Sequence, residues 1–212
     1  MRPLKILTFA LVATGRPSSR LVAAGRDRID HAVACEQTEP LLARHSLEYP
    51  GGYTRSVGPV IGRYLTGLRE FFGRPFAVSP AVLIPRPETE ELVHWMLDTT
   101  KDIEAGRLVD FGTGSGCISV SFKSQRSGWE VTAFDVSISA ISVAIRNAEA
   151  YGTRIRFMKA DMRHSDAFLS ILEGEVDMIV SNPPYIPSNR KETLSASVTA
   201  FEPSLALFTP DD

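Results

Sequence analysis

A glycine-rich turn, Asp110-Phe-Gly-Thr-Gly-Ser-Gly116, is the segment whose residue types first suggest a binding site. Glycines at 112, 114 and 116 allow a backbone to turn tightly and to approach a ligand closely. Their G-x-G-x-G spacing differs from the G-x-G-x-x-G of dinucleotide sites, and no lysine follows where a P-loop needs one. The turn therefore suggests a nucleoside site, with a plain strand-to-helix turn as the alternative.

Two acidic residues follow the next two predicted strands. Asp135 can accept hydrogen bonds from both hydroxyls of a ribose, or it can cap the helix that follows it. Asp161, in the run Lys159-Ala-Asp-Met162, can meet an adenine amino group or remain a solvated loop acid. Because ligands of open α/β sheets bind at the carboxyl ends of the strands, the turn and both acids are expected to converge on one crevice.

The run Ser181-Asn-Pro-Pro-Tyr185 directly follows a fourth predicted strand. Pro183 and Pro184 fix the backbone and have no amide N–H, so nearby carbonyl groups are left to accept bonds from a ligand. Asn182 adds a side-chain acceptor, and Tyr185 adds a flat face. This combination suits a planar substrate bearing an NH₂ group. The nitrogen of such a group is a poor nucleophile, so catalysis would be mostly alignment and electrostatics. A rigid proline turn without catalytic function is the alternative.

The elements that must position these residues alternate between strand and helix. The patterns predict strands over 108–111, 131–134, 155–158 and 176–180, and helices over 88–100, 115–125 and 139–151. Such alternation predicts an α/β fold with a parallel sheet and right-handed crossovers. Before it, we expect a strand or hairpin over 71–78 and a brief β run over 82–84. Loosely helical spacing over 1–50 predicts short helices, followed by a Gly/Pro-rich linker.

The glycine-rich turn and the acids resemble the seven-strand, Rossmann-like class of S-adenosylmethionine-dependent methyltransferases. The resemblance implies that the Asp110–Gly116 turn, including Thr113, surrounds the methionine moiety of this cofactor. It also implies that Asp135 binds the ribose and that Asp161 and Met162 lie near the adenine. Asn182 and its neighbours would then face both cofactor and substrate.

Asn-Pro-Pro-Tyr also occurs in methyltransferases that act on adenine or cytosine amino groups, so the flanking motifs must discriminate. Those motifs are Tyr64-Leu-Thr-Gly67, Glu70-Phe-Phe-Gly73, Val82-Leu-Ile-Pro-Arg-Pro-Glu-Thr-Glu90, Gly116-Cys-Ile118, Phe201-Glu-Pro203 and Ala206-Leu207. Together they closely resemble the release-factor glutamine methyltransferase family over about 64–207. The resemblance implies methylation of the glutamine amide in the Gly-Gly-Gln loop of class-I peptide chain release factors. It also places Arg86, Pro87, Glu88 and Thr89 near the site, with Arg86 and Glu88 as substrate-binding candidates.

The amino-acid composition bears on the class of substrate and on the cellular compartment. The 212 residues carry 23 Lys+Arg against 25 Asp+Glu, a balance that argues against broad neutralisation of nucleic-acid phosphates. Two cysteines offer neither a disulfide framework nor a metal-type spacing, and they fit a reducing compartment. We expect a cytoplasmic monomer without a membrane span. The apolar run over 6–13 is read as part of a soluble domain, with a signal peptide or an organellar presequence as the alternatives.

The resemblance weakens at both ends. Residues 1–62 are expected to form a helical substrate-binding region and linker, and 63–212 a methyltransferase domain. The family continues through further strands beyond this sequence, so four of seven strands are expected here. We therefore expect an open apolar edge at the fourth strand and weak stability. An amino-group methyltransferase of DNA or RNA, or an inactive remnant, remain as alternatives.

Overall fold

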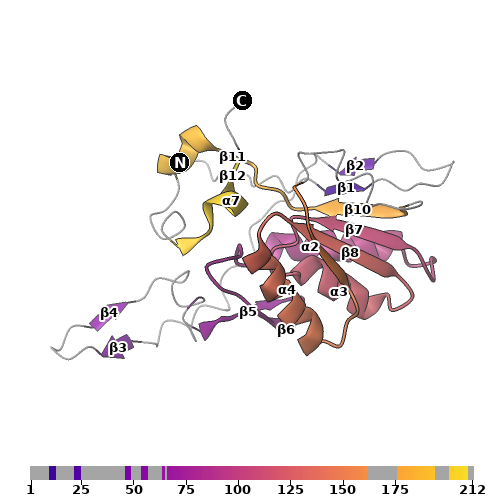
Figure 1. Cartoon of the computed structure of the whole chain (residues 1–212), viewed down its shortest axis with the longest axis horizontal. Coiled ribbons are helices and arrows are strands. Elements are labelled where there is room, and N and C mark those ends of the chain that lie inside the picture. The colour runs from indigo at the N-terminus through magenta and orange to yellow at the C-terminus, as the bar shows by residue number, and fades with distance from the viewer. Residues whose placement is uncertain are drawn as a thin grey trace.

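Four parallel strands form the sheet that carries the glycine-rich turn. The computed structural model describes residues 10–12, 22–24, 46–48, 54–56, 64, 66–161, 176–193 and 201–209. Within these, the strands are β7 (Arg107–Phe111), β8 (Glu130–Asp135), β9 (Arg156–Lys159) and β10 (Met178–Ser181). Their order across the sheet is β10-β7-β8-β9, so the chain winds outward from β7 in both directions (Figure 1). The prediction of a parallel sheet with crossovers is confirmed.

Three helices cover one face of this sheet: α2 (Pro87–Thr99), α3 (Cys117–Gln125) and α4 (Ile138–Ala150) (Figure 1). Pro87 stands at the start of α2, where a missing N–H costs nothing, and acids occupy its first turn. Ser137 caps α4, because its Oγ accepts a hydrogen bond of 3.2 Å from the backbone N of Ala140. All three helices lie within one or two residues of their predicted ranges.

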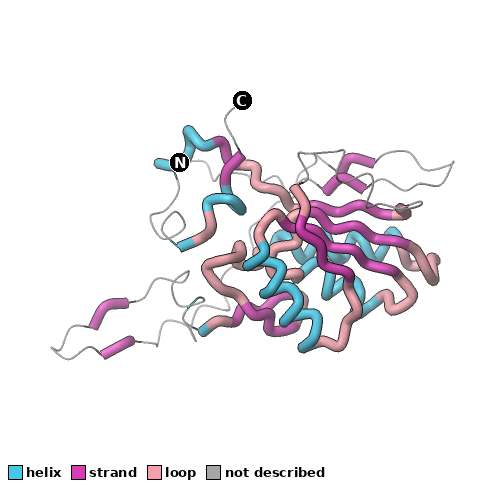
Figure 2. Tube along the Cα trace, in the orientation of Figure 1, coloured by secondary structure: helices cyan, strands magenta, loops and turns pink. Residues whose placement is uncertain are grey.

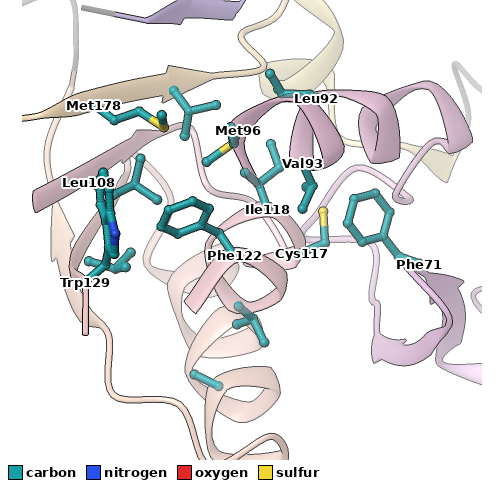
Figure 3. Close-up of a cluster of buried hydrophobic side chains, with 14 of the residues drawn as sticks. Phe71, Leu92, Val93, Met96, Leu108, Cys117, Ile118, Phe122, Trp129 and Met178 are labelled. Atoms are coloured by element: carbon teal, nitrogen blue, oxygen red, sulfur yellow. The ribbon is translucent and has the colours of Figure 1, made fainter. Parts of the chain in front are cut away.

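Alternation of side chains along the strands gives the sheet two apolar faces. On the helical face, Leu108 and Met178 pack with Met96, Phe122 and Trp129, as Figure 3 shows. On the opposite face, a second cluster is built on Val109, Phe111 and Phe134. A strand buried on both faces explains why the predicted strands read as continuous apolar runs.

A hairpin of β5 (Leu68–Phe71) and β6 (Arg74–Ala77) packs against α4. Its two turn residues, Phe72 and Gly73, both have positive φ, as a tight two-residue hairpin requires. The hairpin expected over 71–78 is thus present and starts earlier. The β run expected over 82–84 is wrong: Val82 lies in a bend, and residues 82–84 belong to none of the described strands. Its flanking residues Pro80 and Pro85 cannot donate to a ladder, and Val82 and Ile84 are instead buried in the core.

Helices expected over 1–50 are wrong where the structure describes this region. The described pieces are short strands, β1 (Ala10–Val12), β2 (Val22–Ala24) and β3 (Ser46–Glu48), with β4 (Thr54–Ser56) in the predicted linker. β1 pairs with β2 and β3 pairs with β4, both antiparallel (Figure 2). The turn signals at Gly15–Pro17 and Gly25 leave only residues 18–24 between them, fewer than the roughly 12–15 residues that a marginal helix needs. The rest of 1–62 lies outside the described residues.

The carboxyl-terminal segment returns to the site end of the sheet. It contains α7 (Ser204–Leu207) and β12 (Phe208–Thr209), and β12 pairs in parallel with β11 (Ile186–Pro187). A 3₁₀ helix over Ser188–Thr193 follows β11. Among the described strands, β10 pairs with β7 alone, and β1 lies beside its other edge (Figure 1). No helix in the described parts of the chain is both long and apolar enough to cross a membrane.

Candidate active site

A cavity of about 540 Å³ opens at the carboxyl ends of the parallel strands. Its volume lies in the range of small-molecule and cofactor sites, and its place is where open α/β sheets bind ligands. Each strand contributes the residues that directly follow it or end it. These include Phe111 to Ser115 after β7, Phe134 to Ser137 after β8, Ala160 and Asp161 after β9, and Asn182 to Pro184 after β10. The predicted convergence of the separate motifs on one crevice is confirmed.

The glycine-rich turn lines the cavity with bare backbone. Gly112 and Gly114 have φ of +67° and +56°, values that L side chains rarely adopt. A Cβ at Gly112 would meet nothing within 4 Å, so the missing side chain leaves open space at the turn. A Cβ at Gly116 would lie 3.0 Å from the Cβ of Ala144, so this third glycine permits close packing of the turn against α4. The turn is therefore shaped for close approach of a ligand.

Asp135 holds the turn and also faces the cavity. Its Oδ2 accepts a hydrogen bond of 2.9 Å from the N of Gly114, and its Oδ1 accepts one of 2.9 Å from the N of Ser137. Two carboxylate oxygens have about four acceptor sites, so further bonds to a ligand remain available. Ser137 is the N-cap of α4, so the reading of Asp135 as the helix cap is wrong, whereas its place on the cavity lining is compatible with the ligand-acceptor reading.

Asp110 lies beneath the turn, fully buried, and is not among the residues that line the cavity. Its Oδ2 accepts hydrogen bonds from Thr113 Oγ1 at 2.7 Å and Ser119 Oγ at 2.5 Å. Burial raises the pKa of this carboxyl to about 6, although the two hydroxyl donors act in the opposite direction and Asp135 adds a small increase. The structure thus places Asp110 as a support for the turn.

Asn182 lines the cavity at the end of β10, followed by Pro183 and Pro184. Its Nδ2 donates to Thr89 Oγ1 at 3.5 Å, and Thr89 is buried at the start of α2. The preceding Ser181 donates from Oγ to the carbonyl of Phe111 at 2.9 Å, which fixes the turn to the neighbouring strand. The Asn-Pro-Pro segment is therefore held next to the glycine-rich turn.

The other predicted site residues divide into two groups. Arg86 and Asp161 line the cavity, whereas Glu88 is exposed and Tyr185 is half-buried, and neither of these two belongs to the lining. Burial raises the pKa of the Tyr185 hydroxyl, with Arg86 lowering it and Glu88 and Glu202 raising it further. Met162 lies outside the described residues.

Two positioning residues escaped the sequence reading. Asn147 is buried in α4, and its Oδ1 accepts a hydrogen bond of 2.7 Å from Ala77 N. Its Nδ2 donates to Ala77 O at 3.0 Å and to Ser115 O at 2.8 Å. It therefore joins the hairpin to the glycine-rich turn. Glu202 is buried and forms an ion pair with Arg86. A polar residue on the apolar face of α4 was the available signal for Asn147, and the Phe-Glu-Pro motif was the signal for Glu202.

Comparison with known proteins defines the class. Residues 89–204 match the model of the family described as "Methyltransferase small domain". This range contains the glycine-rich turn, both acids and the Asn-Pro-Pro-Tyr segment. The fold and the cavity are thus those of a methyltransferase domain.

Three curated relatives narrow the class further, and each bears the name release factor glutamine methyltransferase. The chain is 43% identical to the Bacteroides thetaiotaomicron protein over 71% of this chain and 52% of the relative. It is 38% identical to that of Enterococcus faecalis over 84% and 58%, and 36% identical to that of Koribacter versatilis over 97% and 72%. The chain belongs to the release factor glutamine methyltransferase family. It spans about half the length of several of the curated relatives it matches.

A solved structure supports the fold alone. The hMettl16 catalytic domain in complex with MAT2A 3'UTR hairpin 6 aligns with a TM-score of 0.52 and 22% identity, over 71% of this chain and 56% of that one. The methyltransferase family of this chain indicates S-adenosylmethionine as the cofactor. The residues present fit it, because the bare backbone of Gly112 leaves space within the cavity and Asp135 presents acceptors to it.

Proposed function

We propose that this protein transfers a methyl group from S-adenosylmethionine to the side-chain amide nitrogen of a glutamine in class-I peptide chain release factors. The observation that carries the proposal is the position of Asn182 on the lining of the same cavity as the glycine-rich turn and Asp135. A residue suited to orient a planar NH₂ group thus lines the same cavity as the residues expected to bind a nucleoside. The names of the curated relatives support the choice of a release-factor glutamine as the substrate.

The cofactor end of the cavity would be held by the Asp110–Gly116 turn, Asp135 and Asp161. The backbone at Gly112 and Gly114 allows close approach of the methionine moiety, and Asp135 accepts bonds from the ribose hydroxyls. Asp161 follows β9 on the cavity lining and would lie near the adenine. The bound cofactor supplies an electrophilic methyl group on a positively charged sulfur.

At the substrate end, the protein would align a weak nucleophile. The Nδ2 of Asn182 points toward Thr89, so its Oδ1 is directed away from that residue and can accept one amide N–H. A carbonyl of the Asn182-Pro183-Pro184 backbone can accept the second. With both N–H groups held, the nitrogen is aimed at the methyl carbon, and orientation supplies much of the rate enhancement. Tyr185 follows this turn outside the cavity lining, and from there it would contact the substrate.

A labelling assay tests this proposal. The protein is incubated with S-adenosylmethionine carrying a radioactive methyl group and with a class-I release factor. We expect label on the release factor and none on a variant whose Gly-Gly-Gln glutamine is replaced by alanine. Single-stranded DNA and transfer RNA serve as competing acceptors. Label on a nucleic acid with none on the release factor would support the amino-group methyltransferase alternative, which the names of the three relatives above do not favour.

A further inference from the structure

Two segments that are distant in the sequence cover the cavity together. The first cover segment is residues 81–86, between the hairpin and α2, and the second is residues 201–209. Five residues of the first line the cavity, namely Ala81, Val82, Leu83, Pro85 and Arg86. Six of the second also line it: Pro203, Ser204, Leu205, Ala206, Phe208 and Thr209. The cavity therefore depends on how these two segments are held relative to one another.

Each segment is anchored to its own neighbours. In the first, the carbonyl of Val82 accepts a bond of 3.0 Å from Tyr64 OH, and the carbonyl of Pro85 accepts one of 3.4 Å from Arg69 Nε. In the second, β12 pairs with β11, and the carbonyl of Thr209 accepts a bond of 2.8 Å from Ser188 Oγ. These contacts fix each segment without joining one to the other.

An ion pair joins them. Arg86 Nη2 lies 2.6 Å from Glu202 Oε2, and the side chain of Glu202 is fully buried. The pair is close enough to Tyr185, which follows the Asn-Pro-Pro turn, for both of its charges to act on that hydroxyl. Burial raises the pKa of both the Tyr64 and Tyr185 hydroxyls, and the charges of Glu202 and Arg86 act on both in opposite directions. A guanidinium in a fixed fork is suited to this role, because its geometry sets orientation as well as charge.

We propose that Arg86 and Glu202 form a positioning pair that holds the two cover segments together across the cavity and slows the release of bound S-adenosylmethionine. Arg86 then acts on the reaction through Glu202 and the second cover segment, and not as a direct ligand of the substrate. This inference rests on the proposed function, because that function names the molecule that the cavity retains.

The test uses the full chain with Arg86→Glu, Glu202→Arg, the double reversal and Arg86→Lys. Glu130→Gln is the matched control, because Glu130 forms an exposed ion pair of 3.8 Å with Arg107 at the opposite end of the sheet. The first readout is amide hydrogen exchange, segment by segment. The second is the dissociation rate of S-adenosylmethionine, followed by stopped-flow displacement with S-adenosylhomocysteine.

Each single reversal should speed exchange in residues 81–86 and 201–209 and raise the dissociation rate by about tenfold or more, since it leaves a buried charge uncompensated. The double reversal should recover much of both losses, and Arg86→Lys should fall between it and the single reversals. Glu130→Gln should stay within about twofold of the unmodified chain, as expected for an exposed pair.

Two results would overturn the pairing. One is single reversals that behave like Glu130→Gln in both readouts. The other is exchange that accelerates evenly across the whole chain, with no recovery in either the double reversal or Arg86→Lys, which would show a general loss of folding. If the unmodified chain binds no S-adenosylmethionine, the proposed function fails, while hydrogen exchange in the two cover segments still decides whether the pair positions them.

Discussion

The two ends of the cavity are built by different kinds of contact. At the glycine-rich turn, the supporting bonds join residues close in sequence and mostly buried, such as Asp110 with Thr113 and Ser119. At the cover segments, the joining contact is an ion pair between Arg86 and Glu202, 116 positions apart. Asp135 and Asn147 also hold this turn, so the first end is fixed once the stretch from β7 to α4 has folded. The second end requires two segments far apart in the chain to be in place. We infer that binding of the cofactor and alignment of the substrate can be impaired separately.

Changing Asn182 to alanine tests whether the two ends of the cavity act separately. We expect methyl transfer to fall by about a hundredfold or more, because misplacement of a reacting group costs that much even without a change in chemistry. The affinity for S-adenosylmethionine should stay close to that of the unmodified chain, since the glycine-rich turn and Asp135 remain. Single-turnover rates and calorimetric titration measure the two quantities. Equal losses in both would show that the two ends are not separate.

Asn147 offers a test of the contact between the hairpin and the turn. Alanine at this position leaves the N and O of Ala77 and the O of Ser115 without their side-chain partner. Each buried group left unsatisfied costs about 1–3 kcal/mol, so the free energy of unfolding should fall by at least about 2 kcal/mol. Urea denaturation measures it. Asn147→Asp, which keeps the acceptor for Ala77 N but loses both donors, should also destabilise; a neutral result in both variants would contradict this role.

The buried carboxyl of Asp110 predicts a pH dependence of stability. Its pKa is about 6 in the folded protein, against 3.8 for the free side chain. The folded state therefore binds more protons between about pH 4 and 6, so the free energy of unfolding should decrease as the pH rises through this window and level off above it. Two pKa units correspond to at most about 3 kcal/mol. Asp110→Asn should flatten this part of the profile in urea titrations, and an unchanged slope would assign it to other groups.

A pair of glycine substitutions separates backbone strain from ligand contact. Gly112 and Gly152 have φ of +67° and +61°, and a Cβ at either would meet nothing within 4 Å. Alanine at either position should therefore destabilise the fold by a similar amount, about 1–2 kcal/mol. Gly112 lines the cavity and Gly152 does not, so only Gly112→Ala should also weaken binding of S-adenosylmethionine. Equal affinities in the two variants would remove the turn from the cofactor site.

The contrast between contacts close in sequence and contacts far apart in sequence explains which features could be predicted from the sequence. The strands, the helices of the sheet and the convergence of Asp135, Asp161 and Asn182 follow from local apolar patterns and from the geometry of parallel sheets. The ion pair of Arg86 with Glu202 could not be predicted, because nothing local marks two distant charges as partners. Asp110 was placed on the cofactor by its position in the motif. Its side chain turns into the core instead, since alternate residues of a strand point to opposite faces.

Calorimetric titration of S-adenosylmethionine into the unmodified chain and into Asp135→Ala tests the central claim most directly. Glu130→Gln, at the opposite end of β8, is the control. We expect one binding site in the unmodified chain and in the control. We also expect a loss of affinity of about tenfold or more in Asp135→Ala, because each lost charge-assisted hydrogen bond contributes about 1.5–3 kcal/mol. An Asp135→Ala protein that stays folded and binds with unchanged affinity would contradict the assignment of this cavity to the cofactor.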